Sequence, residues 1–138
     1  MSYKFNFDGQ EYDLNDDKLN GFFNDEVNPI NAIDESNILQ ILNDGQGVDF
    51  SKSFYSLACE DCKDENFEKK KAYEFLEFHF YIYTKDGDVV TTTIDKDHEE
   101  NSYDRLYSIG KVNNSYIVSV IACKKCGTFD IEIEELEM

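Results

Sequence analysis

The sequence predicts an α+β fold, with an antiparallel sheet and one or two short helices. Two Asp-Gly pairs follow strand-like segments, one aromatic stretch is long enough for a central strand, and only two segments carry a helical pattern. The chain has 138 residues, the size of one ordinary domain, and 41% of them are hydrophobic, which is enough for a core. No linker or low-complexity stretch divides it. We therefore expect a single domain over residues 1–138.

Both Asp-Gly pairs predict β-hairpins. Tyr3, Phe5 and Phe7 alternate with polar residues up to Asp8-Gly9, and a second short strand follows. The aromatic segment 73–84 leads into the second Asp-Gly pair at 86–87, and residues 89–94 form the return strand.

Two helices are expected. The first covers residues 34–43, with Asp34 or Ser36 as N-cap and Gly45 beyond its end. The second is short, near residues 102–109, and Ser102 caps it. The polar stretch 15–32 has room for one or two helical turns.

The remaining strands are expected at residues 54–58, 116–122 and 128–136, and the first two run directly into a cysteine. In the aromatic segment, the even-numbered positions from Leu76 to Ile82 are apolar and predict a core face. The odd-numbered positions are amphipathic and rich in tyrosine. They favour either a central strand covered on both faces or a surface that binds a partner.

The net charge of −17, from 30 acidic and 13 basic residues, argues against binding to nucleic acid or to an anionic membrane. No apolar run reaches the length of roughly 20 residues that a membrane helix needs, and the first residues lack the apolar core of a signal peptide. One arginine, one proline and no tryptophan are typical of a low-GC bacterium. We therefore expect a bacterial cytoplasmic protein in a reducing compartment, where paired cysteines more often bind metal than form disulfides.

The four cysteines form two CxxC pairs, Cys59 with Cys62 and Cys123 with Cys126. Two residues between thiolates let one tight turn direct both sulfurs at a tetrahedral ion, and four thiolates leave no open position. The spacing therefore predicts a structural Zn²⁺ site made by all four cysteines. Neither His79 nor His98 is spaced to join a pair.

Each pair follows an apolar strand that ends in alanine, and Gly127 follows the second pair. Strand, CxxC, turn and strand, present twice, resemble the zinc knuckles of zinc-ribbon proteins. The knuckles are 60 residues apart, from Lys63 to Ala122, so the resemblance implies a ribbon embedded in a larger sheet. The whole chain also resembles small uncharacterised proteins of anaerobic low-GC bacteria.

Other interpretations of the cysteines stay open. Strand, CxxC and helix is the thioredoxin pattern, so residues 57–75 could form a dithiol oxidoreductase or redox sensor. Glu60 and Asp61 oppose this, because like charge disfavours a thiolate. An iron–sulfur cluster can also use four thiolates, and all four thiols could be inert and buried. The predicted function is a non-enzymatic, zinc-stabilised protein-interaction or adaptor module with a protein partner. An acidic mimic of nucleic acid is a third possibility.

Overall fold

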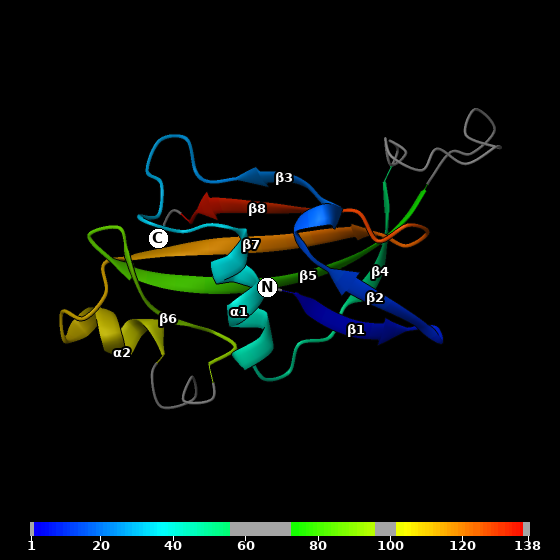
Figure 1. Cartoon of the computed structure of the whole chain (residues 1–138). Coiled ribbons are helices and arrows are strands. Elements are labelled where there is room, and N and C mark those ends of the chain that lie inside the picture. The colour runs from blue at the N-terminus through cyan, green and yellow to red at the C-terminus, as the bar shows by residue number, and fades with distance from the viewer. Residues whose placement is uncertain (1, 56–72, 96–101, 137–138) are drawn as a thin grey trace.

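The computed structural model describes residues 2–55, 73–95 and 102–136. Within them lie a six-stranded sheet, a separate two-stranded hairpin, two α-helices and one 3-10 turn (Figure 1). The predicted α+β class is confirmed. The elements in chain order are β1 (Tyr3–Phe7), β2 (Gln10–Leu14), η1 (Asp16–Lys18), β3 (Leu19–Phe23), α1 (Glu35–Asp44), β4 (Ser51–Tyr55), β5 (Tyr73–Lys85), β6 (Asp88–Thr92), α2 (Tyr103–Ser108), β7 (Asn114–Cys123) and β8 (Phe129–Glu135).

Both predicted Asp-Gly hairpins are present. β1 pairs with β2, and β5 with β6, in antiparallel register. All four turn residues have positive φ: 50° and 77° at Asp8 and Gly9, and 53° and 86° at Asp86 and Gly87. Aspartate and glycine tolerate this left-handed backbone, which matches the twist of the flanking strands.

Both predicted helices are present within a residue or two of the expected bounds. α1 begins after Asp34, whose side chain accepts from the backbone N–H of Asn37, and the Asn37 side chain accepts from the N–H of Asp34. This reciprocal pair satisfies two backbone donors that the first turn leaves free. Ser102 caps α2 with one hydrogen bond, which its hydroxyl oxygen accepts from the N–H of Arg105. No helix in the described ranges is long and apolar enough to cross a membrane.

The stretch 15–32 contains a strand that the sequence analysis did not predict. Asp16–Lys18 forms the expected single helical turn, but Leu19–Phe23 is β3, which pairs with β8 in parallel. The sheet order is β3-β8-β7-β5-β4, with β6 paired to β5. The other pairs in the sheet are antiparallel. The expectation of a purely antiparallel sheet is therefore corrected at one edge.

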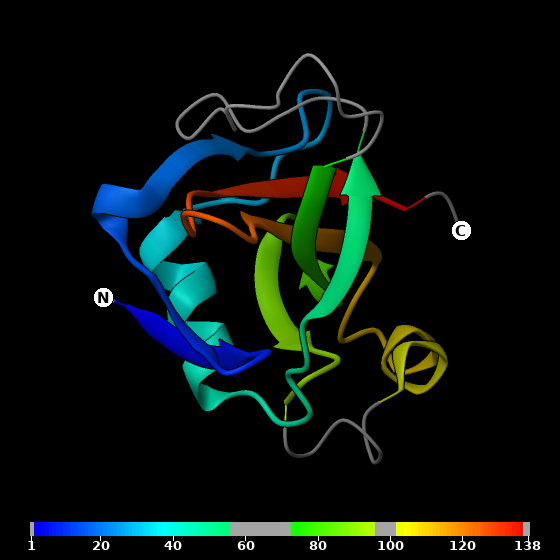
Figure 2. The ribbon, with the colours of Figure 1, turned by 90° about the vertical axis from the view of Figure 1, so that its right-hand side faces the viewer.

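The main core lies between one face of the sheet and a layer made by α1 and the β1–β2 hairpin (Figure 2). The even-numbered positions of β5 face this core, as predicted, and Leu76, Phe80 and Ile82 are fully buried. β7 and β8 contribute their own alternate residues. Other members of this core include Tyr12, Leu14, Ile38, Leu39, Leu42, Phe50, Tyr116, Val118, Val120, Phe129, Ile131 and Ile133.

The opposite face of the sheet is covered only in part. At one end, Tyr83 packs with Leu106 and Val112 beside α2. Elsewhere the odd-numbered positions of β5 remain partly or largely exposed, so the expectation of a strand covered on both faces is wrong over most of its length. We call the uncovered part the open face. Its outward residues are Phe23 of β3, Tyr55 of β4, Glu77, His79 and Tyr81 of β5, Ile117, Ser119 and Ile121 of β7, and Asp130, Glu132 and Glu134 of β8.

Candidate metal centre

The second cysteine pair occupies a tight turn between β7 and β8. The Cys123 N–H donates to the carbonyl oxygen of Thr128 at 2.8 Å, and the Gly127 N–H donates to the carbonyl of Cys123 at 2.9 Å. Gly127 has a φ of 80°, in the left-handed region that favours glycine. Cys123 and Cys126 therefore lie on one tight turn that closes on a glycine.

The two cysteine residues differ in exposure. Cys123 is buried, while Cys126 is half-buried and its Sγ lies 3.2 Å from Thr128 Oγ1. A thiol donates in such a contact, and a thiolate accepts from the hydroxyl instead. Thr128 can therefore stabilise the deprotonated form of Cys126, which is the form that binds a metal.

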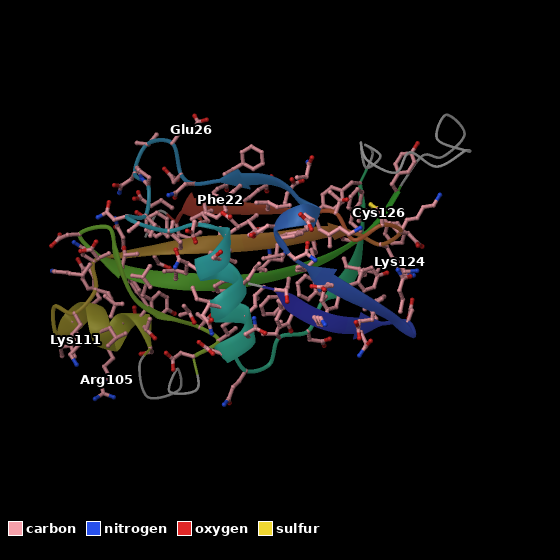
Figure 3. All side chains as sticks on the ribbon, viewed as in Figure 1. Phe22, Glu26, Arg105, Lys111, Lys124 and Cys126 are labelled. Atoms are coloured by element: carbon pink, nitrogen blue, oxygen red, sulfur yellow. The ribbon has the colours of Figure 1, made fainter. Side chains whose placement is uncertain are left out.

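The N-terminal part of the chain holds the turn in place. The Tyr12 hydroxyl donates to the carbonyl oxygen of Lys124 at 2.5 Å, and Lys18 Nζ donates to the carbonyl of Cys126 at 3.2 Å. Figure 3 shows the labelled Lys124 and Cys126 at the β7–β8 turn, next to the β1–β2 hairpin. Since these contacts satisfy two carbonyl groups of the turn, its shape does not depend on the β7–β8 ladder alone.

Lys124 carries the local positive charge. Its Nζ lies 3.4 Å from a carboxylate oxygen of Glu74 and 3.7 Å from one of Asp8. The hydrogen bond with Glu74 raises the pKa of Lys124, and the same bond lowers the pKa of Glu74. The lysine is thus already paired within the described residues. Glu60 and Asp61, the acidic residues between the cysteines of the first pair, lie outside the described ranges.

The first pair, Cys59 and Cys62, also lies outside the described ranges, but the strands that flank it are described. β4 ends at Tyr55, which pairs with Tyr73 at the start of β5. Two residues further along β5, Phe75 is opposite Cys123. The described strands on either side of the first pair, β4 and β5, therefore meet at the end of the sheet where the Cys123–Cys126 turn lies.

The chain from Tyr55 to Cys59 is long enough to reach the second pair. The Cα atoms of Tyr55 and Cys123 are two strand spacings apart across the sheet and two residues apart along it, which is about 12 Å. Cys59 follows Tyr55 by four residues, and four residues span up to about 14 Å. The chain length therefore permits all four sulfurs to meet at one ion.

A polar network on the open face was missed by the sequence analysis. His79 Nδ1 lies 2.8 Å from Ser119 Oγ, and its Nε2 lies 3.5 Å from Glu77 Oε1. Tyr55 also donates to Glu77. Burial raises the pKa of Glu77, but the hydrogen bonds from Tyr55 and His79 outweigh it, so the net shift is downward. The i, i+2 spacing of Glu77 and His79 could have signalled a shared face, whereas Ser119 requires knowledge of the strand register.

Serine, histidine and glutamate at these distances resemble a nucleophilic triad, but their setting does not support acyl transfer. Ser119 lies in mid-strand, and β7 pairs with β5 on one side and β8 on the other. The ladders use the backbone N–H groups near Ser119, so these cannot form an oxyanion hole. The network instead fixes side-chain positions on the open face.

The comparisons with known proteins give one match. A family model described as "Protein of unknown function (DUF3785)" matches residues 3–138. No curated protein and no solved structure matches the chain. Among the described residues, which include only the second cysteine pair, no group of three or more His, Cys, Asp or Glu side chains could hold a metal ion.

Proposed function

Because the chain belongs to the DUF3785 family, whose description assigns no function, we propose a function from its own chemistry: a protein-interaction module stabilised by structural zinc. Cys59, Cys62, Cys123 and Cys126 are the proposed ligands. Four thiolates would complete a tetrahedral shell and leave no position for water or substrate, so the ion would have a structural role. No catalytic residue is proposed.

The observation that carries this proposal is the tight turn at Cys123–Cys126. Its α-turn closes on Gly127, whose backbone has positive φ, so that Cys123 and Cys126 lie on one short turn. The position of β4 and β5 adds support, since β4 ends about 12 Å from Cys123 and the four residues from Tyr55 to Cys59 can span about 14 Å. A zinc ion shared by both pairs would then tie the 56–72 segment to the sheet.

The local structure gives the redox alternative less support. Redox-active CxxC pairs lie at the start of a helix, whose N-terminus lowers a thiol pKa. The second pair is followed by a turn and then by β8, a strand. Its first cysteine, which would have to attack a disulfide, is also the more buried of the two.

The uncovered face of the sheet supports a role in binding. The open face carries exposed Phe23 and Tyr81 together with several carboxylates, and exposed aromatic residues are enriched where proteins bind one another. The triad-like network on this face lacks the donors that catalysis needs. The proposed activity is therefore recognition of another protein, with zinc fixing one end of the sheet.

Metal analysis tests the proposal. Protein purified without added metal should contain one zinc per chain, and cobalt in its place should give the absorption of tetrahedral thiolate coordination. The iron–sulfur alternative would instead give iron with acid-labile sulfide. Reversible oxidation of each pair, without bound metal, would support the redox alternative.

Two variants of the same turn provide a matched comparison. Cys126→Ser should release zinc and lower the melting temperature, whereas α1 and the β1–β2 hairpin should keep part of their protection from hydrogen exchange because they have their own core. Lys125→Ala changes an exposed neighbour and should keep the metal. If Cys126→Ser melts like the original protein and neither protein contains metal, the zinc site is wrong.

A further inference from the structure

A hollow of about 440 Å³ lies at the β3–β8 edge of the sheet. Phe23, Val27, Glu132 and Glu134 are among its lining residues. The exposed fraction is 55% for Phe23 and 95% for Val27, so two large apolar side chains face solvent on its walls. Glu26 projects outward from the same loop (Figure 3). Val27 buries almost no apolar area and so adds little to the stability of the fold. Exposed apolar residues grouped beside polar ones are typical of sites that bind another protein.

The loop that carries Val27 is held rigidly. Asp25 accepts hydrogen bonds from the N–H groups of Val27, Asn28 and Glu135, at 3.0, 2.8 and 2.8 Å. The buried Tyr116 hydroxyl donates to the carbonyl oxygen of Asn28 at 2.7 Å. The hollow is therefore formed before any ligand arrives, which reduces the entropy cost of binding.

The acidic residues beside the hollow form a row. Asp130, Glu132 and Glu134 occupy alternate positions of β8 and point to the open face, so successive carboxylates are about 7 Å apart. Burial raises the pKa of Glu132, and the negative charges of Asp130 and Glu134 raise it further. Within the described residues, no lysine or arginine forms an ion pair with Glu132 or Glu134. A row of this kind does not converge on a point, and no metal-binding group is found among those residues.

We propose that this hollow binds an extended segment of a partner protein that carries lysine or arginine at alternate positions. Alternate side chains of an extended chain repeat at about 7 Å, which is the spacing of the carboxylates on β8. The aliphatic stems of the basic residues can pack on Phe23 and Val27 while their charged ends reach the carboxylates. A second copy of this chain is disfavoured, because it would bring another net charge of −17. The inference rests on the protein-interaction part of the proposed function.

Three peptides test the proposal against the zinc-loaded protein. The probe is Lys-Ser-Lys-Ser-Lys with blocked ends, and the control Lys-Lys-Lys-Ser-Ser has the same charge with the wrong spacing. A third peptide, Glu-Ser-Glu-Ser-Glu, has the opposite charge. The probe should shift the amide NMR signals of Phe23, Val27, Glu132 and Glu134, and should bind about fivefold more tightly than the first control. The glutamate peptide should not bind.

Charge-matched variants separate the site from the general acidity of the protein. Glu132→Gln with Glu134→Gln should weaken binding of the probe about tenfold, since two ion pairs are lost. Glu11→Gln with Asp49→Asn removes the same charge from exposed positions away from the open face and should leave binding unchanged. Equal losses in both variants, or equal binding of the two lysine peptides, would overturn the proposal.

The outcomes also distinguish this inference from the zinc site. Metal content and peptide binding are separate measurements on the same sample. A metal-free protein that still selects the correctly spaced peptide would retain the docking surface and refute the zinc site. A zinc-loaded protein that does not select between the lysine peptides would support the zinc site and refute the docking surface.

Discussion

Tyr12 and Lys124 are 112 positions apart in sequence, yet the Tyr12 hydroxyl donates a 2.5 Å hydrogen bond to the Lys124 carbonyl oxygen. Tyr12 also stacks on Phe5, with ring centroids 5.1 Å apart, so its ring is fixed within the β1–β2 hairpin. The hairpin thereby contacts the cysteine turn directly. A substitution in the β1–β2 hairpin should therefore alter the stability of the cysteine turn.

Tyr12→Phe removes this hydrogen bond and keeps the ring. Losing the partner of a partly buried carbonyl should reduce the free energy of unfolding by about 1 kcal/mol and the melting temperature by about 4 °C. Thermal denaturation measures the effect, and Tyr107→Phe, at an exposed position of α2, is the control. Equal melting of Tyr12→Phe and the original protein would show that the contact contributes nothing to stability.

Gly127→Ala should destabilise the turn through its backbone. An added Cβ would meet only Tyr12 Cδ1, at 3.7 Å, so space is available, but the φ of 80° is strained for alanine and costs about 1 kcal/mol. Gly110→Ala has the same strain, with a φ of 77° and open space around it, and it lies before the start of β7 whereas the cysteine turn follows the end of that strand. Both variants should melt earlier, but only Gly127→Ala should lose zinc to a weaker chelator. Equal zinc retention in both would separate the turn from metal binding.

The two lysines between Cys123 and Cys126 have different surroundings, since Lys124 is paired with carboxylates and Lys125 is exposed. Lys124→Glu places a third carboxylate beside Glu74 and Asp8, so the variant should melt several degrees lower at neutral pH, and added salt should restore part of the loss. Lys125→Glu changes the net charge by the same amount at an exposed position and should have a smaller effect. Equal losses would mean that overall charge, and not the contact with Glu74, decides the result.

The stability that the Glu74–Lys124 pair contributes should depend on pH. The pKa of Glu74 is lowered in the folded protein by Lys124, so its stabilising effect is complete above the unfolded pKa and is lost as the pH falls through the folded pKa. The difference in melting temperature between Lys124→Glu and the original protein should therefore shrink on acidification. Melting curves from neutral to strongly acidic pH measure it, and a constant difference would contradict the assignment.

Asp25→Ala should loosen the loop that carries Val27. The pKa of Asp25 is lowered chiefly by the hydrogen bond from the Glu135 N–H, with a further one from Asn28, and its contribution is therefore lost as acid protonates it. We expect a melting temperature a few degrees lower near neutral pH and little difference in strong acid. Glu26→Ala, next along the chain and exposed, is the control. A loss that persists at low pH would show that the charge of Asp25 is not involved.

The predictable parts of the fold are those with local chemical signals. Asp8-Gly9 and Asp86-Gly87 specify their turns because few other residues adopt the required φ, and Asp34 specifies a helix start through its side chain. β3 carries no such signal, since Asn20 and Gly21 have low strand propensity. Its partner β8 supplies the pairing, and that partner is remote in sequence.

The candidate site is predictable to the same extent. Spacing alone identifies the cysteine pairs, and Gly127 marks the turn of the second pair. The end of β4 and the start of β5, which flank the first pair, lie near the Cys123–Cys126 turn because of the strand order, which spacing does not encode. The exposure of the open face could not be predicted either, because alternation along β5 identifies two faces of the strand but not which elements cover them.

The parallel pairing of β3 with β8 has a consequence during synthesis. The side-chain hydrogen bond between Asn20 and Asp130 joins residues 110 positions apart, and β3 has no other strand partner in the described sheet. A ribosome that adds roughly 5–20 residues each second needs about 5–20 s to make the intervening chain. Throughout that time Phe22 and Phe23 have no strand beside them, which is the condition under which a nascent chain engages a holding chaperone or a neighbouring chain.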